Sequence, residues 1–531
     1  MHSQLVKYDN EQALDECLQQ LQHYPSLVSI KEIKTLKKRV KQATLGGRFI
    51  VQGGDCVEMF YDCNENVINN KLQSAVLVKS LFEVLTKKPV TFIGRIAGQY
   101  TKPRSSLFQT INGEEMHSYR GDLINSADSC VEKRKPDPKR LLAGAHHAAM
   151  TLNYMRTTLA SSEQSFSLDL FPWVKELTHE LELDAEAIQQ NYAQGRKQSL
   201  IDQDEFELFT SHEALNLHYE QGFDKEGKDG LKYNCSAHML WIGARTLTQD
   251  NPLVHYLSQI ENTIGLKVGP DIDPEDLIKI INTLNPNRDL GKLVLIGRFG
   301  VSEYQSRLPK ILAALNEADI KICWLSDPMH GNTFTTTQGI KTRCFNTMLS
   351  ESSGMATLLD QHQNHLGGLH LEFTGCAVTE CINGHFVVSE QDLHKNYSSA
   401  IDPRLNQQQF VEFILRMAKH IQSFEAFDYC EDQFAQELFT SYRQDIDDID
   451  DHLINLLATR RKLSRAVGEL KSALNINIFD PKREKQILVE LIEKGQAKGF
   501  NQQWLERLFL EIFQDSRAIQ SAVPGSLKTV G

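Results

Sequence analysis

The chain has 531 residues, of which 57 are lysine or arginine and 69 are aspartate or glutamate, so its formal net charge is −12. This length exceeds one ordinary hydrophobic core, and we therefore expect two domains. With 41% hydrophobic and 24% charged residues, the composition is that of a folded protein, which excludes a fibrous or disordered chain. The acidic balance gives no global reason to expect DNA or RNA binding, so any anion site has to be local.

Cysteine usage and the first residues of the chain predict a cytoplasmic protein. The ten cysteines form no CxxC pairs, and the opening MHSQLVKYDNEQALDE lacks the apolar core of a signal peptide. These features favour reduced thiols, which are typical of the cytoplasm. No uninterrupted run of about 18 apolar residues occurs, so we expect no membrane span.

Short apolar runs recur between stretches with helical periodicity, and each run ends in glycine or polar residues. Buried parallel strands read as continuous apolar runs, and their alternation with helices is typical of βαβ units. Eight such units predict a closed (β/α)8 barrel. The runs are FIVQGGDC (49–56), VTFIGRIAG (90–98), FELFTSHEA (206–214), HMLWIGA (238–244), GLKVG (265–269), LVLIGRFG (293–300), KICWLSD (321–327) and LHLEFTG (369–375).

Polar and charged residues stand at or just beyond the ends of these runs. In such a barrel the chemistry lies at the C-terminal ends of the strands, so we expect the active site there. One apolar run that ends in a charge marks any strand leaving a core, but repetition along the chain favours a shared site. The residues concerned are Asp55, Cys56, Arg95, Arg245, Lys267, Arg298, Asp327 and Glu372.

Two segments depart from the alternation of strands and helices. The segment from about 160 to 205 is longer than an ordinary barrel connection and is predicted to form extra helices, with regulation as a candidate role. The acidic stretch 422–440 separates two differently patterned regions. We therefore predict a barrel domain over residues 1–435 and a second domain over residues 440–531.

The second domain shows the pattern of three helices from Tyr442 onward. The first helix carries an apolar stripe at helical spacing, which includes Leu453. The second begins at Asp480-Pro481, an N-cap residue followed by proline at the first helical position. A third is expected from about Gln502 to Gln520. The predicted fold is thus an α/β barrel with extra helices, followed by an all-α three-helix domain.

Polar side chains converge on the apolar faces of these three helices. Arg460 and Lys471 are eleven residues apart, close to three full turns, so both lie on the stripe that we expect to face a core. Arg483 shares the apolar side of the second helix, and Ser516 and Gln520 share that of the third. A single lysine or arginine here would lay its aliphatic stem along the apolar surface and keep its charged end in water. A set of buried cations would be costly without partners, so the whole set predicts an anionic ligand.

Residues 442–520 resemble the helical class of chorismate mutases along the strings RQDIDDIDDHLINLLATRRKLSRAVGELK, DPKRE and IFQDSRAIQ. The resemblance implies conversion of chorismate to prephenate, a rearrangement that needs a compact conformer and stabilised charge but no nucleophile. It also implies an interlaced dimer in which Arg443 serves the site of the other subunit. The roles it implies are carboxylate binding by Arg443, Arg460 and Arg483, contact with the ether oxygen by Lys471 and Gln520, and contact with the ring or its hydroxyl by Asp480, Glu484 and Ser516.

Four residues on separate strand ends or loops of the barrel region are candidates for one metal site. One thiolate, one imidazole and two carboxylates suit a divalent transition ion, with manganese as our first expectation and cobalt, iron and zinc as alternatives. Each residue alone is more often a structural thiol or an ordinary hydrogen-bonded side chain. The four are Cys56, His330, Glu372 and Asp402.

Six basic residues fall at or just beyond the predicted strand ends. Such clustering indicates phosphate or carboxylate ligands. The sequence contains no GxxxxGK[ST] loop, which argues against a nucleotide site of that type and favours small phosphorylated metabolites. The six are Arg95, Lys102, Arg104, Arg245, Lys267 and Arg298.

Residues from about 10 to 420 resemble the type II family of 3-deoxy-arabino-heptulosonate 7-phosphate (DAHP) synthases. The strings that carry the resemblance are QGGDC, RIAGQYTKPRS, YRGDLIN, FTSHEAL, LWIGART, GLKVGP, RFG, DPMHGNT, KTR, GGLHLEFTG, VTEC and DPRLN. It implies condensation of phosphoenolpyruvate with erythrose 4-phosphate at a metal held by the four candidate ligands. The roles it implies are binding of phosphoenolpyruvate by Arg95, Arg245, Lys267 and Arg298, catalysis by Lys267 and Arg245, and binding of the sugar phosphate by Lys102, Arg104 and Ser105.

Some residues depart from the pattern of this family. Ala244 stands where the family usually has an acidic residue directly before Arg245, so a water-positioning group is missing there. The resulting GART string is similar to that of type I synthases, which perform the same reaction. Leu123 and Cys376-Ala377 also depart from the pattern and leave a different aldose phosphate open as the acceptor.

These patterns lead to a bifunctional enzyme of the shikimate and aromatic amino acid pathway as the first hypothesis. A second hypothesis makes the helical domain a sensor of chorismate or prephenate that regulates the barrel, and a third assigns the barrel to a specialised pathway. An intact set of polar residues favours catalysis, because a sensor needs no pair facing the ether oxygen; the set is Arg443, Arg460, Lys471, Arg483, Glu484 and Gln520. The fusion and the extra helices also predict inhibition of the barrel by an aromatic end product or prephenate.

Overall fold

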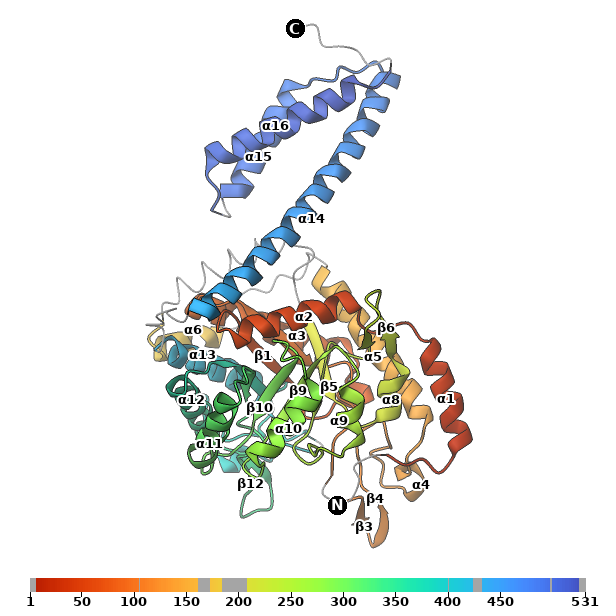
Figure 1. Ribbon diagram of the computed structural model, residues 1–531, viewed down its shortest axis with the longest axis vertical. Helices are drawn as coiled ribbons and strands as arrows, with labels where there is room; N and C mark the ends of the chain where they lie inside the picture. Colours follow the sequence, from red (N-terminus) through yellow and green to blue (C-terminus); the bar gives the residue numbers. More distant parts are fainter. Residues whose placement is uncertain are drawn as a thin grey trace. The chain divides into compact units, whose positions relative to one another are not determined.

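The computed structural model describes residues 6–104, 106–160, 172–183, 208–399, 401–423, 432–496 and 499–524. The described residues up to 423 form one compact unit, and those from 432 onward form a second. The first unit contains all the described strands, and the described part of the second contains helices (Figure 1). None of the described helices is long and apolar enough to cross a membrane.

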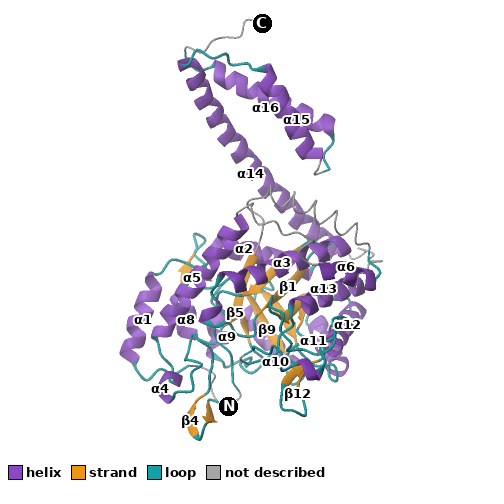
Figure 2. Ribbon diagram, turned by 180° about the vertical axis from the view of Figure 1, so that it is seen from behind, coloured by secondary structure: helices purple, strands orange, loops and turns teal. Residues whose placement is uncertain are grey.

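Eight parallel strands close into a barrel in the first unit, which confirms the predicted (β/α)8 fold. The order around the barrel is β1-β14-β11-β10-β9-β8-β5-β2, so each strand pairs with two neighbours. Figure 2 shows the strands enclosed by helices. The strands are β1 (Phe49–Gly54), β2 (Val90–Arg95), β5 (Leu208–Glu213), β8 (Met239–Ile242), β9 (Thr263–Val268), β10 (Leu293–Gly297), β11 (Cys323–Ser326) and β14 (Leu366–Glu372).

The burial of these strands explains their continuous apolar runs. Successive side chains of a strand point to opposite faces. Ile50, Ile93 and Leu325 come from different strands and form one cluster, which places them inside the barrel. Their neighbours in sequence, such as Trp324, pack with the surrounding helices instead. Both faces of a strand are therefore covered by apolar side chains.

Capping residues mark where the helices of the first unit begin. Ser29 and Glu32 form a capping box at the start of α2. Asp273 caps α10 and is followed by Pro274, whose missing N–H costs no hydrogen bond there. The helices are α1 (Glu11–His23), α2 (Ile30–Thr44), α3 (Glu65–Thr86), α4 (Val131–Arg134), α5 (Lys139–Ala160), α6 (Pro172–Glu180), α8 (Leu217–Gly222), α9 (Pro252–Leu257), α10 (Pro274–Leu284), α11 (Tyr304–Glu317), α12 (Phe345–Gln361) and α13 (Gln407–Gln422), with short 3-10 helices η1 (Phe60–Asp62) and η3 (Glu390–Asp392).

Among the described residues, three antiparallel hairpins are added to this framework: β3 (Phe108–Ile111) with β4 (Glu114–His117), β6 (Asp224–Glu226) with β7 (Lys232–Asn234), and β12 (Thr333–Thr335) with β13 (Lys341–Arg343). Much of the predicted insert near 160–205 lies outside the described residues. Its described helix, α6, is fixed by the Trp173 ring, which meets Phe386 edge-on at 5.9 Å. Glu180 at its end pairs with Arg416 at 3.0 Å. The regulatory role of the insert stays a prediction.

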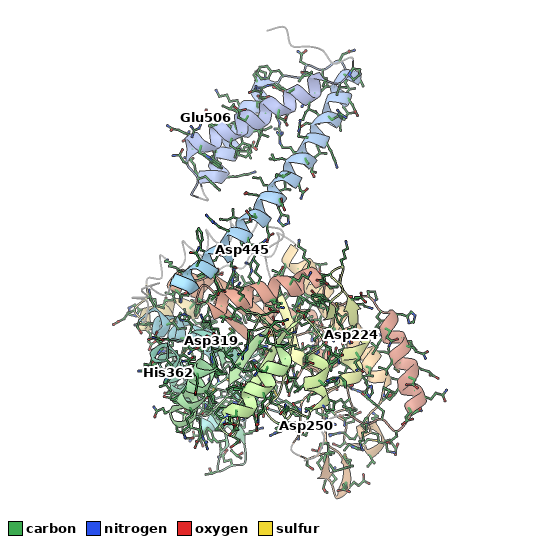
Figure 3. The ribbon with its side chains drawn as sticks, in the orientation of Figure 1. Asp224, Asp250, Asp319, His362, Asp445 and Glu506 are labelled. Atoms are coloured by element: carbon green, nitrogen blue, oxygen red, sulfur yellow. The ribbon has the colours of Figure 1, made fainter. Side chains whose placement is uncertain are left out.

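The second unit contains α14 (Asp432–Ala473), α15 (Pro481–Gln496) and α16 (Gln502–Ser521). α14 begins at Asp432, before the start expected at Tyr442, so the change of pattern there marks no break in the helix. The prediction for α15 is confirmed, because the side chain of Asp480 accepts a hydrogen bond from the Arg483 N–H at 3.0 Å. α16 is amphipathic: Leu505 is buried, whereas Glu506 projects outward (Figure 3).

The apolar stripe of α14 is exposed within this chain, which corrects the expectation that it faces a core. Ile446, Leu453 and Leu456 keep 56%, 53% and 69% of their surface exposed. Nearer its C-terminal end, α14 approaches α16 closely, since a Cβ on Gly468 would lie 2.9 Å from Gln520 Cα. A hydrophobic pattern shows which face of a helix is apolar, but not which molecule covers it.

The barrel core predicts a clear difference between two equal substitutions. Leu325→Ala inside the barrel, where Leu325 is fully buried, is expected to lower the free energy of unfolding by about 2–5 kcal/mol because it leaves a cavity. Leu231→Ala, at a position 45% exposed, is the control and should change it by less than about 0.5 kcal/mol. Urea unfolding followed by tryptophan fluorescence measures both. Equal stabilities of the two variants would contradict the placement of Leu325.

Candidate metal and anion sites

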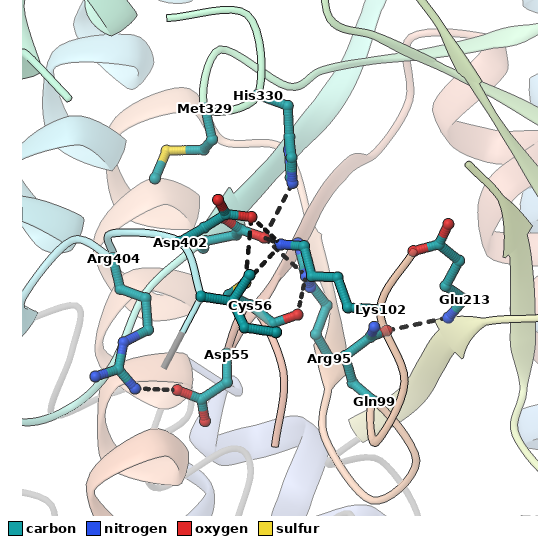
Figure 4. Close-up of polar contacts among 12 residues, drawn as sticks. Asp55, Cys56, Arg95, Gln99, Lys102, Glu213, Met329, His330, Asp402 and Arg404 are labelled. Atoms are coloured by element: carbon teal, nitrogen blue, oxygen red, sulfur yellow. Dashed lines mark hydrogen bonds and ion pairs between the residues drawn. The ribbon is translucent and has the colours of Figure 1, made fainter. Parts of the chain in front are cut away.

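Three side chains of metal-ligand type meet at the C-terminal ends of the barrel strands (Figure 4). The Cys56 Sγ and one carboxylate oxygen each of Glu372 and Asp402 lie within 4.8 Å of one another, and all three residues are buried. Cys56 follows β1, and Glu372 ends β14, which pairs with β1 at Gly54. The Leu405 N–H donates to the Glu372 carbonyl at 2.9 Å, which fixes the loop of Asp402 beside β14.

His330 lies beside these three residues. Its Nε2 is 3.1 Å from Glu372 Oε1, and its Nδ1 is 2.8 Å from Asp327 Oδ2. Asp327 follows β11 and is fully buried, so it orients the ring through Nδ1 and leaves Nε2 directed at the cluster. A carboxylate behind a histidine is the usual outer support of a metal-binding imidazole. The structure therefore gathers Cys56, Glu372 and Asp402 in one cluster and places the fourth predicted ligand, His330, against Glu372 at its edge.

The ammonium group of Lys102 lies among these side chains. Its Nζ is 2.5 Å from Cys56 Sγ and 3.3 Å from Glu372 Oε1, and it also forms an ion pair with Asp402. Buried acidic groups need positive charge beside them, and here a lysine supplies it. One thiol, one imidazole and two carboxylates also fit a divalent transition ion at this place. The resemblance assigns Lys102 to the sugar phosphate, whereas in the structure it contacts the ligand set.

The electrostatics of the cluster favour ionised carboxylates but not an isolated thiolate. Burial raises the pKa of Glu372, but His330, Lys102 and Arg343 more than offset burial and hold this pKa well below its usual range. Burial and the nearby Glu372 raise the pKa of the Cys56 thiol to about 12, against the influence of Lys102. The thiolate form of Cys56 therefore depends on further positive charge, such as a bound metal ion.

Basic side chains surround the ligand cluster. Arg95, at the end of β2, pairs with Glu372 at 3.0 Å, and Arg298, after β10, donates to the His330 carbonyl at 3.0 Å. Lys267 on β9 is buried, and burial lowers its pKa. Across the described part of the chain, neither Arg95 Nε nor Arg298 Nε finds a hydrogen-bond acceptor, although both atoms are buried. These N–H groups are suited to an anionic ligand.

Three further residues are predicted to bind the anionic substrates. Arg245 lies exposed in the turn 244–246, which follows β8. Arg104 is half-buried on the loop after β2, and Ser105 falls outside the described residues. The substrate-binding roles of these three residues stay predictions.

Arg343 belongs to the site but is missing from the sequence prediction. It lies on β13, is fully buried, and its Nη1 is 2.7 Å from Glu372 Oε2. Its Nε donates to Thr333 Oγ1 at 2.8 Å, which ties the β12–β13 hairpin together beside the ligand cluster. The KTR string contains this arginine, but nothing local in the sequence indicates a carboxylate on β14 as its partner.

Glu213 is a second residue that the sequence prediction misses. It ends β5 and is buried, and its Oε1 has no hydrogen-bond partner among the described residues. Gly243 makes room for it, because a Cβ there would lie 2.1 Å from Glu213 Oε1. Burial raises the pKa of Glu213, against the influence of Lys267. The carboxylate thus lies beside the residue that precedes Ala244, where the expected acidic side chain is absent. Its place at the end of the FELFTSHEA run is the sequence feature that marks it.

A second polar site lies along α14 and α16. Arg460 Nη1 donates to Ser516 Oγ, and Lys471 Nζ donates to the Ile478 carbonyl at 2.6 Å. Gln520 Oε1 is a buried atom, and the described residues offer it no partner. The side chains of Arg460, Lys471 and Gln520 are half-buried and not directed into bulk solvent.

Of the other predicted residues of this unit, Arg443 lies apart from that site along α14. Arg443 stacks over the Phe439 ring at 4.2 Å and precedes Arg460 on the same helix, α14. The two arginines are about 25 Å apart along the helix axis at about 1.5 Å per residue, so one pocket within this chain does not include both. Arg483 is exposed at the start of α15, where Glu484 pairs with Arg517 at 2.5 Å.

Comparison with known proteins supports the same division of the chain. The model of the class-II DAHP synthetase family matches residues 1–418, and that of chorismate mutase type II matches residues 442–521. A phospho-2-dehydro-3-deoxyheptonate aldolase of Neurospora crassa is 37% identical over 456 residues, which cover 78% of this chain and 92% of that protein. Proteins of this description from Streptomyces coelicolor and Mycolicibacterium smegmatis are both 34% identical, over 427 and 414 residues, which cover 78% and 75% of this chain and 94% and 88% of theirs. The chain therefore belongs to the class-II DAHP synthetase family and carries a chorismate mutase type II region after its barrel.

Proposed function

We propose that this chain catalyses two reactions of aromatic amino acid biosynthesis. The barrel condenses phosphoenolpyruvate with erythrose 4-phosphate and water to DAHP and phosphate, and the helical unit rearranges chorismate to prephenate. The observation that carries the first assignment is the buried set of Cys56, Glu372 and Asp402 around a positive charge. The matching family models and the names of the relatives support both assignments.

The four clustered side chains are proposed to hold one divalent metal ion. Manganese is the first candidate, with cobalt, iron and zinc as alternatives, because thiolate, imidazole and carboxylate donors suit these ions. The chemistry that such an ion supplies when bound is polarisation of the aldehyde oxygen. Asp327 orients the imidazole of His330 for this role through Nδ1. The proposed ligands are Cys56, His330, Glu372 and Asp402.

The basic side chains around the cluster are proposed to bind the two phosphorylated substrates. The buried Nε groups of Arg95 and Arg298, for which the described residues provide no acceptor, support the binding of phosphate or carboxylate groups by these arginines. Fixed cations in a water-poor site hold both substrates for attack of the enol carbon on the aldehyde carbon. We propose Arg95, Arg245, Lys267 and Arg298 for phosphoenolpyruvate, and Lys102, Arg104 and Ser105 for erythrose 4-phosphate.

Glu213 is proposed to replace the acidic side chain that is missing at Ala244. After the carbon–carbon bond forms, water has to add at the carbon that bears phosphate, and a carboxylate with an unused oxygen can position this water. The partnerless Oε1 of Glu213 in the described structure supports this role, as does its closeness to Gly243. Lys267, whose pKa is lowered by burial, is the proposed partner in proton transfer.

The half-buried polar groups of the helical unit are proposed to bind chorismate. Arg460 and Arg483 would hold its carboxylates, while Lys471 and Gln520 stabilise negative charge on the breaking ether bond. The buried Gln520 Oε1, without a partner among the described residues, supports a ligand there. Asp480, Glu484 and Ser516 are the proposed contacts with the ring and its hydroxyl.

We propose a homodimer formed through the helical unit. The exposed apolar stripe of α14 needs a cover, and a second copy of α14 offers the same stripe. The distance along α14 between Arg443 and Arg460 supports an arrangement in which Arg443 reaches the site of the second copy.

We also propose a division near residues 435 to 440, within the first turns of α14, between a barrel (1–435) and a mutase domain (440–531). The cytoplasmic location is proposed from cysteine usage alone.

Two substitutions are expected to separate the activities. Cys56→Ala removes a proposed metal ligand and should reduce loss of phosphoenolpyruvate, with manganese and erythrose 4-phosphate, by more than about 100-fold. Lys471→Ala should reduce chorismate loss by about 100- to 1000-fold. Each should spare the other reaction, because the sites lie in different units. Cys130→Ala and Lys462→Ala, at exposed positions, are the matched controls.

The wild-type chain in the same paired assay distinguishes the other hypotheses. Loss of phosphoenolpyruvate only with a different aldose phosphate would indicate a specialised pathway. Binding of chorismate without its conversion would make the helical unit a sensor.

Glu213→Gln tests the proposed water-positioning carboxylate. The amide keeps the shape of the side chain but cannot take up a proton, so kcat of the condensation should fall by about 100- to 10,000-fold while the KM for phosphoenolpyruvate stays near the wild-type value. Glu226→Gln, at an exposed position on β6, is the control. A Glu213→Gln chain with the wild-type kcat would remove Glu213 from the mechanism.

Leu453→Asp tests the proposed dimer. A charge on the exposed stripe of α14 should prevent association, so sedimentation should show a monomer and chorismate turnover should be lost. Asn455→Asp adds the same charge at an exposed position on the opposite side of α14 and should leave the dimer intact. If Leu453→Asp still sediments as a dimer, the stripe is not the interface.

A further inference from the structure

Glu380 is a fully buried carboxylate that lies close to the proposed metal ligands without being one of them. It accepts hydrogen bonds from the backbone N–H groups of Ser398 (3.1 Å), Ser399 (2.8 Å) and Arg404 (2.8 Å). It also accepts two bonds from the Arg404 guanidinium, at 3.0 Å from Nε and 2.8 Å from Nη2. These donors flank Asp402 on both sides, so one carboxylate fixes the backbone before and after a proposed ligand.

Arg404 continues from this carboxylate to the other side of the ligand set. Its Nη1 lies 2.6 Å from Asp55 Oδ1 (Figure 4). Asp55 is buried, directly precedes Cys56, and also forms an ion pair with Lys71 on α3. One guanidinium therefore joins the loop of Asp402 to the residue next to Cys56, two positions that are far apart in the sequence.

The geometry of this connection suits an arginine and not another cation. A guanidinium is planar and carries its N–H donors in a fixed fork, so it binds two carboxylates at once in a defined orientation. A lysine ammonium on a flexible stem would reach one of them. Buried ion pairs are often no more stabilising than apolar side chains of the same volume, whereas a fully hydrogen-bonded network fixes positions. This network is thus better explained by positioning than by stability.

We propose that Arg404, held between Glu380 and Asp55, is a positioning residue that sets the separation of Cys56 and Asp402 and thereby the affinity of the site for a divalent metal ion. The inference rests on the proposed function of this cluster as a metal centre. Outer partners of metal ligands typically change metal affinity by about 10- to 100-fold when they are replaced. Arg404→Lys, which keeps the charge but loses the fork, should weaken metal binding within this range.

The test uses the full-length chain, stripped of metal by a chelator and titrated with Co²⁺. Thiolate-to-cobalt absorption reports the bond to Cys56, and competition with a coloured chelator gives the dissociation constant. For Arg404→Lys we expect an altered absorption band, binding weaker by about 10- to 100-fold, and recovery of kcat at saturating metal, which a general folding defect would not show. Arg416→Lys is the matched control, because Arg416 also joins two carboxylates, Glu412 and Glu180, in the same unit.

The possible outcomes separate this inference from the function on which it rests. Equal Co²⁺ affinity and absorption in the wild type and Arg404→Lys would overturn the positioning role and leave the metal centre intact. A wild-type chain without thiolate-to-cobalt absorption would instead remove the metal centre, and the inference with it. If Arg404→Lys does not fold, Asp55→Asn and Glu380→Gln each remove one side of the bridge. Both should then weaken Co²⁺ binding, and unchanged affinity in both would overturn the inference.

Discussion

Glu372 is a carboxylate with no exposed surface, and its charge has to be balanced inside the protein. Arg95, Arg343 and His330 each bring a nitrogen within 3.1 Å of its oxygens. These partners come from β2, the β12–β13 hairpin and the loop after β11, so one buried charge orders three segments that are distant in the sequence. The same Glu372 carboxylate also helps to raise the pKa of the Cys56 thiol, so its charge acts on both the basic side chains and a proposed metal ligand.

The two units hold the cationic side chains of their proposed anion sites in different ways. In the barrel, cations are drawn into a buried network with carboxylates, whereas in the helical unit Arg460 and Lys471 are half-buried and satisfied by a hydroxyl and a carbonyl. Both units nevertheless keep buried polar atoms for which the described residues provide no partner: Nε of Arg95 and Arg298, and Oε1 of Gln520. Such atoms are costly to leave unpaired, and they mark the places where the proposed substrates would complete the hydrogen bonding.

The barrel and the ends of its strands could be predicted from the sequence, because apolar runs and the polar residues that follow them are local features. Cys56 and Glu372 are examples, since they stand at the ends of strands that prove to be paired. Glu213 also stands at the end of such a run, but its role could not be assigned, because it depends on the space that Gly243 leaves beside its carboxylate. Arg404 could not be assigned either, because its partners are carboxylates on two other loops. Such partners depend on how distant loops meet, which no local pattern contains. For the same reason, the periodicity of α14 showed which face of the helix is apolar but not which surface packs against it.

Because the apolar face of α14 is uncovered within one chain, the stability of the helical unit is expected to depend on protein concentration. Leu453 and Leu456 remain exposed in this chain, so in the proposed homodimer folding and assembly of the helical unit become one equilibrium. Its stability then rises with protein concentration by mass action. The barrel closes within one chain, and the described metal-ligand cluster comes from that one chain. Dilution alone would therefore separate the two activities: the rearrangement of chorismate would fade first, while the condensation persists.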